Sequence, residues 1–126
     1  MPVNKSILVV DDEFDIVNII KQVLQKQGFT TYAFTDPLLA LEHLKTNSKS
    51  YGLVLVDVRM PAMNGFELVK KIKSMHPTIK ILLMSAFEFN DIELSRALTS
   101  IKIDGYIQKP VSTKELVNII EKHLQN

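Results

Sequence analysis

Leu53-Val54-Leu55-Val56-Asp57 is an unbroken aliphatic run that ends in a carboxylate. Two other runs have the same character, Ile7-Leu8-Val9-Val10 and Ile81-Leu82-Leu83-Met84. Four consecutive apolar residues are typical of a strand that is buried on both faces, as in a parallel sheet covered by helices on both sides. The three runs therefore predict the inner strands of such a sheet.

Weaker patterns on either side of these runs complete the alternation. Residues 30–34 and 104–107 are strand-like but more polar, as edge strands usually are. Five helical patterns alternate with the strands, each marked by a start or stop signal: Gly28 as a C-terminal cap, Asp36-Pro37 as an N-cap and first helical position, Gly65 ahead of a helix that Pro77 ends, and capping boxes at 90–93 and 112–115. The order of elements predicts an α/β fold of five βα units.

This alternation predicts a doubly wound, five-stranded parallel sheet with helices on both faces, because right-handed crossovers place successive helices on the two sides. The two polar candidate edges favour the flavodoxin-like strand order 2-1-3-4-5. The chain has 126 residues, which suits one domain over residues 1–126. No composition break within it indicates a linker.

Composition excludes several classes of function. The chain has no cysteine, so disulfides, thiolate metal sites and cysteine nucleophiles are ruled out. A formal net charge of +1 without long charged runs argues against nucleic-acid binding and against a membrane-surface patch. The first apolar run is too short for a signal peptide or a membrane span, and we expect a cytoplasmic protein. The three histidines, His43, His76 and His123, show no metal or catalytic pattern and are expected to be solvated.

The residues that follow the apolar runs carry the chemical signal. Ligands of an open parallel sheet bind at the carboxyl ends of its strands, beside the point where the strand order reverses. The runs end in Asp11-Asp12-Glu13, in Asp57 and in Ser85, and the last strand candidate ends in Lys109 after Gln108. Three carboxylates, a hydroxyl and an ammonium are thus expected at one edge of the sheet.

Such a cluster of acids suggests a divalent cation. Two carboxylates 4 Å apart repel by about 4 kcal/mol at an effective dielectric constant of 20. A hard cation such as Mg²⁺ relieves this repulsion and prefers carboxylate and water ligands. Asp11-Asp12 also suits a helix N-cap, alone or together with the metal role. Lys109 is able to compensate the charge of Asp57 and to hold a phosphoryl oxygen, and Ser85 taken alone is an ordinary strand-end hydroxyl.

Four blocks of this sequence together resemble the receiver family of two-component response regulators. They are residues 9–13 (Val-Val-Asp-Asp-Glu), 55–65 with Met-Pro at 60–61 and Asn-Gly at 64–65, Met84-Ser85-Ala86, and Gln108-Lys109-Pro110. The resemblance implies that Asp57 is the phosphoacceptor. It implies that Asp12 and Asp57 bind Mg²⁺ directly, Asp11 through water, and that the backbone carbonyl of Arg59 is a further ligand.

The resemblance also implies partners and a switch. The phosphoryl donor would be a sensor histidine kinase or a histidine phosphotransfer protein, and the chain would catalyse only its own phosphorylation and slow dephosphorylation. Ser85 would move onto the phosphoryl group and Tyr106 would turn inward. That movement would alter the face made by the fourth helix, the last strand and the last helix, where a downstream protein or a second copy would bind. Lys109 would contact the phosphoryl group, and its bond to Pro110 would often be cis.

Two stretches depart from the pattern of this family. Residues 102–105, Lys-Ile-Asp-Gly, replace a small Gly-Ala pair that many relatives carry before an acidic residue, which makes the loop before the last strand uncertain. Phe87 is unusually apolar for its place beside the site. With Arg59 it would flank the path of a hydrolytic water, so we predict a long-lived phosphorylated state unless the ring packs into the core.

Three other functions fit the sequence less well. A flavodoxin-like nucleotide binder needs a Ser-, Thr- and Gly-rich loop after the first strand, where this chain has Asp11-Asp12-Glu13. A hydrolase of the haloacid-dehalogenase type needs a second acid two residues after its nucleophile, but Arg59 occupies that position after Asp57. A receiver that works without phosphorylation usually lacks site residues, and this chain keeps all of them.

Overall fold

The computed structural model describes residues 6–61, 63–86, 96, 100 and 103–124. In this part of the chain five strands form one parallel sheet in the order β2-β1-β3-β4-β5. Their bounds are Ser6–Val10 (β1), Thr31–Phe34 (β2), Tyr51–Asp57 (β3), Lys80–Ser85 (β4) and Gly105–Gln108 (β5). The predicted sheet and its strand order are confirmed.

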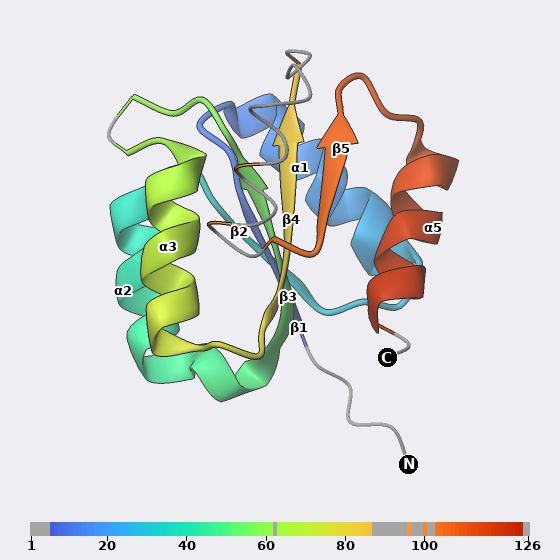
Figure 1. The fold of residues 1–126 in the computed structure, drawn as a ribbon. Coiled ribbons are helices and arrows are strands. Elements are labelled where there is room, and N and C mark those ends of the chain that lie inside the picture. The colour runs from blue at the N-terminus through green and yellow to red at the C-terminus, as the bar shows by residue number, and fades with distance from the viewer. Residues whose placement is uncertain (1–5, 62, 87–95, 97–99, 101–102, 125–126) are drawn as a thin grey trace.

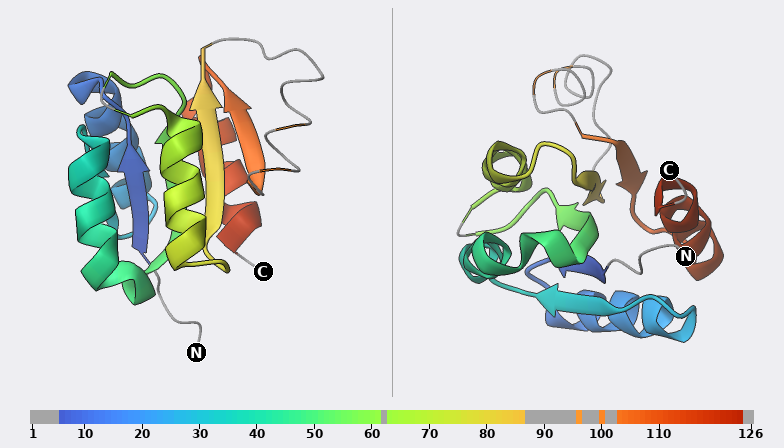
Figure 2. Two further views of the ribbon diagram at one scale, coloured as in Figure 1. Left: turned by 60° about the vertical axis from the view of Figure 1, so that its left-hand side comes forward. Right: turned by 90° about the horizontal axis from the view of Figure 1, so that it is seen from below.

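Helices cover both faces of the sheet. They are α1 (Phe14–Lys26), α2 (Pro37–Asn47), α3 (Gly65–Met75) and α5 (Thr113–Leu124), with a short 3₁₀ turn at Ser48–Ser50. Helices α1 and α5 lie on one face, and α2 and α3 lie on the other (Figures 1 and 2). The helix predicted after the capping box at 90–93 lies outside the described residues. None of the described helices has the length and apolar character that crossing a bilayer requires.

This layering explains the unbroken apolar runs. Leu53 and Leu55 of β3 pack into the cluster beneath α1 and α5, whereas Val54 and Val56 pack into the cluster beneath α2 and α3. Consecutive side chains of a strand point to opposite faces, so a strand covered on both sides needs an apolar residue at every position. Each such side chain contributes about 1.5–3 kcal/mol by its burial.

The predicted start and stop signals of the helices are mostly confirmed. Gly28 follows α1 with φ 93°, a conformation that glycine adopts without strain. Three side-chain oxygens accept backbone N–H groups at the starts of α2, α3 and α5: Asp36 from Leu38 at 2.9 Å, Asn64 from Glu67 at 2.9 Å and Ser112 from Glu115 at 3.1 Å.

The alternative in which Asp11-Asp12 caps α1 is wrong. The N-cap of α1 is Glu13, which makes no side-chain cap bond. The Asp11 carboxylate instead accepts the Glu13 N–H at 3.0 Å, before the helix begins. The acids after β1 therefore lie on a turn, where their charge faces the end of the sheet.

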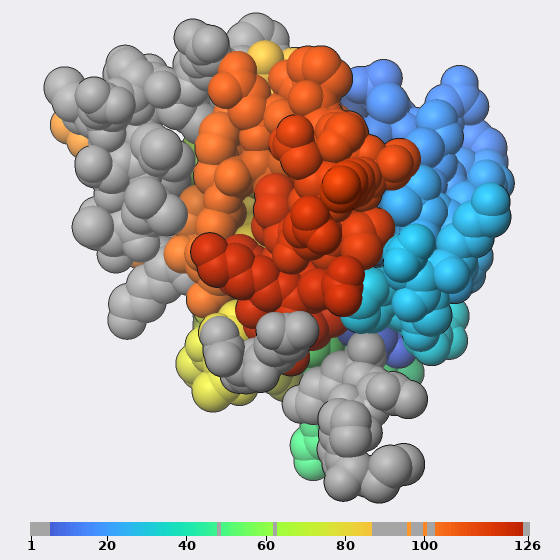
Figure 3. Space-filling model, turned by 90° about the vertical axis from the view of Figure 1, so that its right-hand side faces the viewer, coloured from blue at the N-terminus to red at the C-terminus, as the bar shows by residue number. Residues whose placement is uncertain are grey.

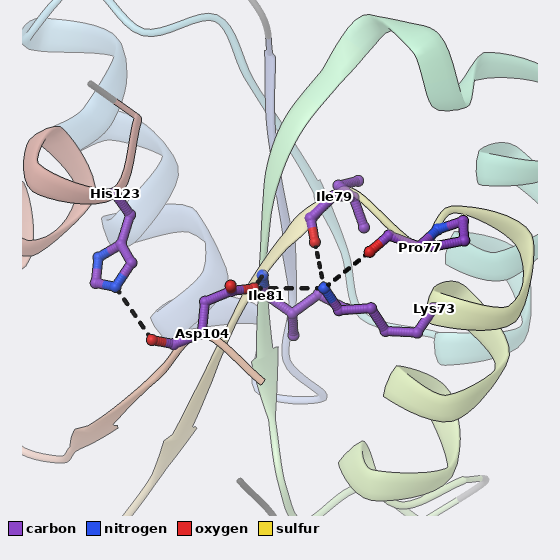
Figure 4. A network of polar contacts seen from close by, with 6 residues as sticks. All are labelled: Lys73, Pro77, Ile79, Ile81, Asp104 and His123. Atoms are coloured by element: carbon purple, nitrogen blue, oxygen red, sulfur yellow. Dashed lines mark hydrogen bonds and ion pairs between the residues drawn. The ribbon is translucent and has the colours of Figure 1, made fainter. Parts of the chain in front are cut away.

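Asp104 ties together several elements at the amino end of the sheet (Figure 4). Its N–H donates to the Ile81 carbonyl at 2.8 Å, and its carboxylate accepts the Ile81 N–H at 2.7 Å. These two bonds extend the β4–β5 pairing by one residue, so the unusual sequence before β5 preserves the pairing. From α3, Lys73 reaches the same carboxylate at 3.5 Å and the Ile79 carbonyl at 2.7 Å.

The histidines expected to be solvated are partly exposed, and the side chains of two of the three also form hydrogen bonds within the protein. His123 on α5 contacts the Ile119 carbonyl at 2.9 Å and the Asp104 carbonyl at 3.3 Å. His43 on α2 lies 2.6 Å from the Tyr51 hydroxyl. Burial, followed by the nearby Tyr32 phenol, raises the pKa of Tyr51 to about 12, so its hydroxyl remains protonated and hydrogen-bonded at neutral pH.

Candidate functional site

The sheet brings the expected site residues to one edge. Asp11 follows β1 directly, Asp57 is the last residue of β3, Ser85 is the last residue of β4, and Lys109 follows β5. The strands end together because β3 and β4 pair Asp57 with Met84, and β4 and β5 pair Ser85 with Gln108. The Lys109 N–H then donates to the Ser85 carbonyl at 2.7 Å, which fixes the lysine beside the site.

Lys109 joins two of the three carboxylates. Its Nζ lies 2.7 Å from Asp11 Oδ2 and 3.3 Å from Asp57 Oδ1. Asp11, Asp12 and Asp57 each offer a carboxylate oxygen within 4.8 Å of the others. Asp11 is fully buried and Asp57 is 6% exposed, whereas Asp12 is open to solvent. The predicted convergence of acids and ammonium is therefore present in the structure.

The environment of Asp57 disfavours the ionised form of its carboxylate. Burial, and then the charge of Asp11, raise the pKa of Asp57 to about 6 despite the opposing effect of Lys109. Burial alone would lower the pKa of Lys109, but its bond to Asp11 and the charges of Asp11 and Asp57 outweigh burial, so its pKa is raised.

The donor set suits a hard divalent cation. In formal charges, three carboxylates and one ammonium carry −3 + 1 = −2, which a doubly charged cation would neutralise. Carboxylate oxygens this close together are the ligands that such cations select. Among the described residues this is the only group of three or more potential metal ligands. The acidic cluster is compatible with a receiver-type metal site.

The other residues predicted for the site lie on β4, on β5 and in the segment after β3. Ser85 is buried at the end of β4, and Tyr106 in β5 is partly buried against the cluster beneath α2 and α3. Arg59 is exposed, two residues beyond Asp57. The Lys109–Pro110 bond is cis, as the resemblance implies. Phe87 lies outside the described residues, so its predicted role beside the site stays a prediction.

Two features of the site were missed by sequence reasoning. Gly65, which the sequence marks as the residue ahead of a helix and as part of a block shared with the receiver family, packs directly against the backbone of Asp57 and Val58. A groove of about 380 Å³ also adjoins Lys109, between α1 and α5, and is lined mainly by apolar side chains such as Ile16, Pro110 and Leu116. The Asn64-Gly65 pair was a signal for the first feature, but the groove depends on how two distant helices pack.

Comparison with known families agrees with this geometry. The response regulator receiver domain matches residues 7–121, nearly the whole chain. The chain belongs to this family. All the site residues discussed above fall inside the matched range.

Several named proteins are similar in sequence to this receiver domain. It is 30% identical over 122 residues to sporulation initiation phosphotransferase F of Bacillus subtilis, covering 96% of this chain and 94% of that protein. It is 35% identical to the alkaline phosphatase synthesis transcriptional regulatory protein SphR of Synechococcus elongatus and 37% identical to the transcriptional regulatory protein ZraR of Klebsiella oxytoca. Both matches cover 88% of this chain, but only 45% and 24% of those longer regulators.

Solved structures show the same fold. A CheY-like response regulator receiver domain from Methanospirillum hungatei superposes with a TM-score of 0.87 at 28% identity, covering 96% of this chain and 94% of that one. The receiver domain of the Francisella response regulator 1452 gives a TM-score of 0.85 at 26% identity, covering 97% of this chain and 98% of that one. The observed strand order is therefore that of a CheY-like receiver.

Proposed function

We propose that this receiver domain, taken as residues 1–126, accepts a phosphoryl group on Asp57 from a phosphohistidine in a phosphorelay. The observation that carries the proposal is the Asp57 carboxylate itself. It ends an inner strand, is almost fully buried, and shares Lys109 with a second acid. A buried carboxylate whose pKa is displaced by its neighbours is a candidate functional group, because the fold maintains its charge at a cost.

In the proposed reaction an Asp57 oxygen attacks phosphorus, and the bond between phosphorus and the donor's imidazole nitrogen breaks. The imidazole leaves with the electron pair of that bond, and an acyl phosphate remains on the chain. Lys109 Nζ, held beside Asp57, would neutralise a phosphoryl oxygen, and Ser85 would donate a hydrogen bond to another. Mg²⁺ bound by Asp12, Asp57 and the Arg59 carbonyl, with Asp11 acting through water, would supply further neutralisation of charge.

The proposed product is a signalling state. The chain would act on no substrate besides its own aspartate, so we class it as a phosphoacceptor switch. Ser85 is the last residue of β4. Tyr106 lies on the neighbouring strand β5, where it pairs with Leu83 of β4. A shift of Ser85 towards the phosphoryl group would therefore alter the packing of Tyr106.

The proposed partners meet the molecule near the site and on an adjoining face. A sensor histidine kinase or phosphotransfer protein would approach Asp57 over the carboxyl edge of the sheet, where the apolar groove and exposed Phe14 and Ile19 of α1 adjoin it. A downstream protein or a second copy would bind the surface that includes β5 and α5. These two elements lie side by side, and α1 lies next to α5 (Figure 3). We propose that this exchange takes place in the cytoplasm.

Intact-mass measurement tests the assignment of Asp57. Wild-type protein incubated with Mg²⁺ and a small-molecule phosphodonor such as acetyl phosphate should gain one phosphoryl group, and Asp57→Asn should gain none. Asp104→Asn is the matched control, because it removes a carboxylate at the opposite end of the sheet. Equal labelling of the wild type and Asp57→Asn would refute the proposal.

The switch has a separate test. On phosphorylation, amide chemical shifts in residues 90–120 should change as well as those at the site, and Tyr106→Ala should reduce the distant changes without preventing labelling. Changes restricted to the strand ends would contradict a propagating switch.

A further inference from the structure

Gly65 is in closer contact with the backbone of the phosphoacceptor strand than any other amino acid could be. A Cβ atom at this position would lie 2.5 Å from the Asp57 carbonyl oxygen, 2.8 Å from Val58 Cα and 3.1 Å from the Asp57 carbonyl carbon. All three are backbone atoms, which cannot rotate away as the end of a side chain can. The Gly65 N–H also donates a 2.7 Å hydrogen bond to the Val58 carbonyl.

This contact closes the loop that follows Asp57. The chain leaves β3 at Asp57 and returns so that the first residue of α3 lies against the strand end it has just left. Val58 and Met60 on this loop are buried in the core cluster beneath α3, so apolar packing anchors the loop from below. Between them is Arg59, whose backbone carbonyl is expected to bind the cation. The position of that carbonyl relative to Asp57 thus depends on how closely α3 approaches the strand.

We propose that Gly65 is a positioning residue for the metal site. The inference rests on the proposed function, because it concerns the Mg²⁺ that phosphorylation of Asp57 would require. A side chain at position 65 must move away from the Asp57 carbonyl by about 0.9 Å (3.4 − 2.5) to reach an ordinary van der Waals distance. Mg²⁺ demands nearly ideal octahedral geometry at about 2.0–2.1 Å, so a shift of even part of this size between two of its ligands weakens binding.

The rival explanation is that glycine is needed only for α3 to fold. Two variants of this chain separate the two roles. Gly28→Ala introduces backbone strain, because Gly28 has φ +93°, yet a Cβ there would meet nothing within 4 Å. Asn64→Ala removes the cap of the same helix, the 2.9 Å bond from the Glu67 N–H, without adding an atom near Asp57. Both should destabilise the fold and leave the metal site in place.

The experiment is a Mg²⁺ titration of metal-free protein followed by backbone amide chemical shifts, with thermal unfolding measured in EDTA. We expect Gly65→Ala to weaken Mg²⁺ binding at least tenfold and to slow labelling by acetyl phosphate by a similar factor. Gly28→Ala and Asn64→Ala should lower the melting temperature and bind Mg²⁺ within twofold of the wild type. If Gly65→Ala is unfolded, the titration is repeated on all variants at low temperature with trimethylamine N-oxide, which favours the folded state.

The outcomes separate this inference from the proposed function. Wild-type protein that binds no Mg²⁺ would refute the proposed function. Wild-type protein that binds Mg²⁺ while Gly65→Ala binds it equally well would overturn the positioning role alone. A Gly65→Ala protein that stays unfolded in the osmolyte would also overturn it, because glycine would then be a requirement of folding.

Discussion

The two ends of the sheet contain the same kinds of charged groups in different balance. At the amino end, the carboxylate of Asp104 accepts a backbone N–H at 2.7 Å and lies 3.5 Å from the ammonium of Lys73. One acid there faces one base. At the carboxyl end, three carboxylates lie within 4.8 Å of one another, and Lys109 is the ammonium that joins two of them.

This difference separates a structural carboxylate from the carboxylate that we propose is the phosphoacceptor. The Asp104 carboxylate takes the place of a missing ladder partner for Ile81, so it stabilises the chain as it stands. The Asp57 carboxylate lies where burial and neighbouring acids disfavour its charge, and these two effects raise its pKa to about 6. A fold retains such a group when a ligand or a reaction makes use of its charge. Equivalent substitutions at the two ends should therefore have opposite effects.

The largest expected difference is in phosphorylation. Asp12→Ala should slow labelling by acetyl phosphate about 100-fold or more, because a bound cation contributes several kcal/mol of charge stabilisation in the transition state. Asp104→Ala should label at close to the wild-type rate. Initial rates measured by intact mass at saturating Mg²⁺ decide the matter, with circular dichroism to show that both variants are folded. Normal labelling of Asp12→Ala would place the metal site elsewhere.

For stability the order of the two ends should be reversed, so that Asp104→Ala destabilises the fold more than Asp12→Ala does. Asp104→Ala should lower the free energy of unfolding by about 2 kcal/mol, because the partly buried Ile81 N–H loses its acceptor. Asp104→Asn should lose less, since its amide oxygen still accepts that bond and only the exposed ion pair with Lys73 is weakened. Urea unfolding of the three proteins measures this. Equal stability of the wild type and Asp104→Ala would show that the network at the amino end contributes nothing.

How much of the fold and the site is predictable from the sequence depends on whether each signal is local in the chain. The sheet and its strand order were predictable because runs such as residues 53–56 demand burial on both faces, and polar runs mark the edges. The site was predictable in outline because Asp57 and Ser85 end strands, Asp11 and Lys109 directly follow strands, and parallel strands end at one edge. These signals are local, and the topology converts them into proximity.

The features that were missed depend on contacts between distant segments. The close approach of Gly65 to Asp57 and the bond of His123 to Asp104 depend on how the helices pack on the sheet. A capping motif near Asp11 was also assigned to the wrong residue, because an acid before a helix is able to bond the preceding turn as readily as the helix itself. None of these is encoded in a periodicity.

A smaller effect is expected from pH. In metal-free buffer the folded protein retains a proton on Asp57 up to a pKa of about 6, whereas the unfolded chain releases it near the ordinary value of 3.8. Between those values the folded state binds more protons, so this group makes stability fall as pH rises from about 4 to about 6. Asp57→Asn should abolish that contribution and be about 1–2 kcal/mol more stable than the wild type at pH 7, with allowance for solvent screening.

Urea unfolding of both proteins across this range in EDTA measures the difference between them. Saturating Mg²⁺ should reduce the gap, because a cation that binds the ionised Asp57 stabilises only the wild-type folded state. Parallel curves for the two proteins from pH 4 to pH 7 would show that burial and the neighbouring acids do not raise the pKa of Asp57.

The smallest effect should come from a substitution of His123, which joins α5 to the amino end of the sheet. Its Nδ1 lies 2.9 Å from the Ile119 carbonyl of its own helix and its Nε2 lies 3.3 Å from the Asp104 carbonyl. A Cβ on Gly105 would lie only 3.3 Å from Nε2, so the ring also packs against the start of β5. His123→Ala should therefore lower the free energy of unfolding by about 1 kcal/mol or less, since one modest hydrogen bond and a partly exposed ring are lost.

Amide exchange should quicken in the last turn of α5 while labelling of Asp57 is unchanged, because the contact lies at the far end of the sheet from the acids. Slower labelling of His123→Ala would mean that the two ends are coupled, and the division between a structural end and a functional end would then fail.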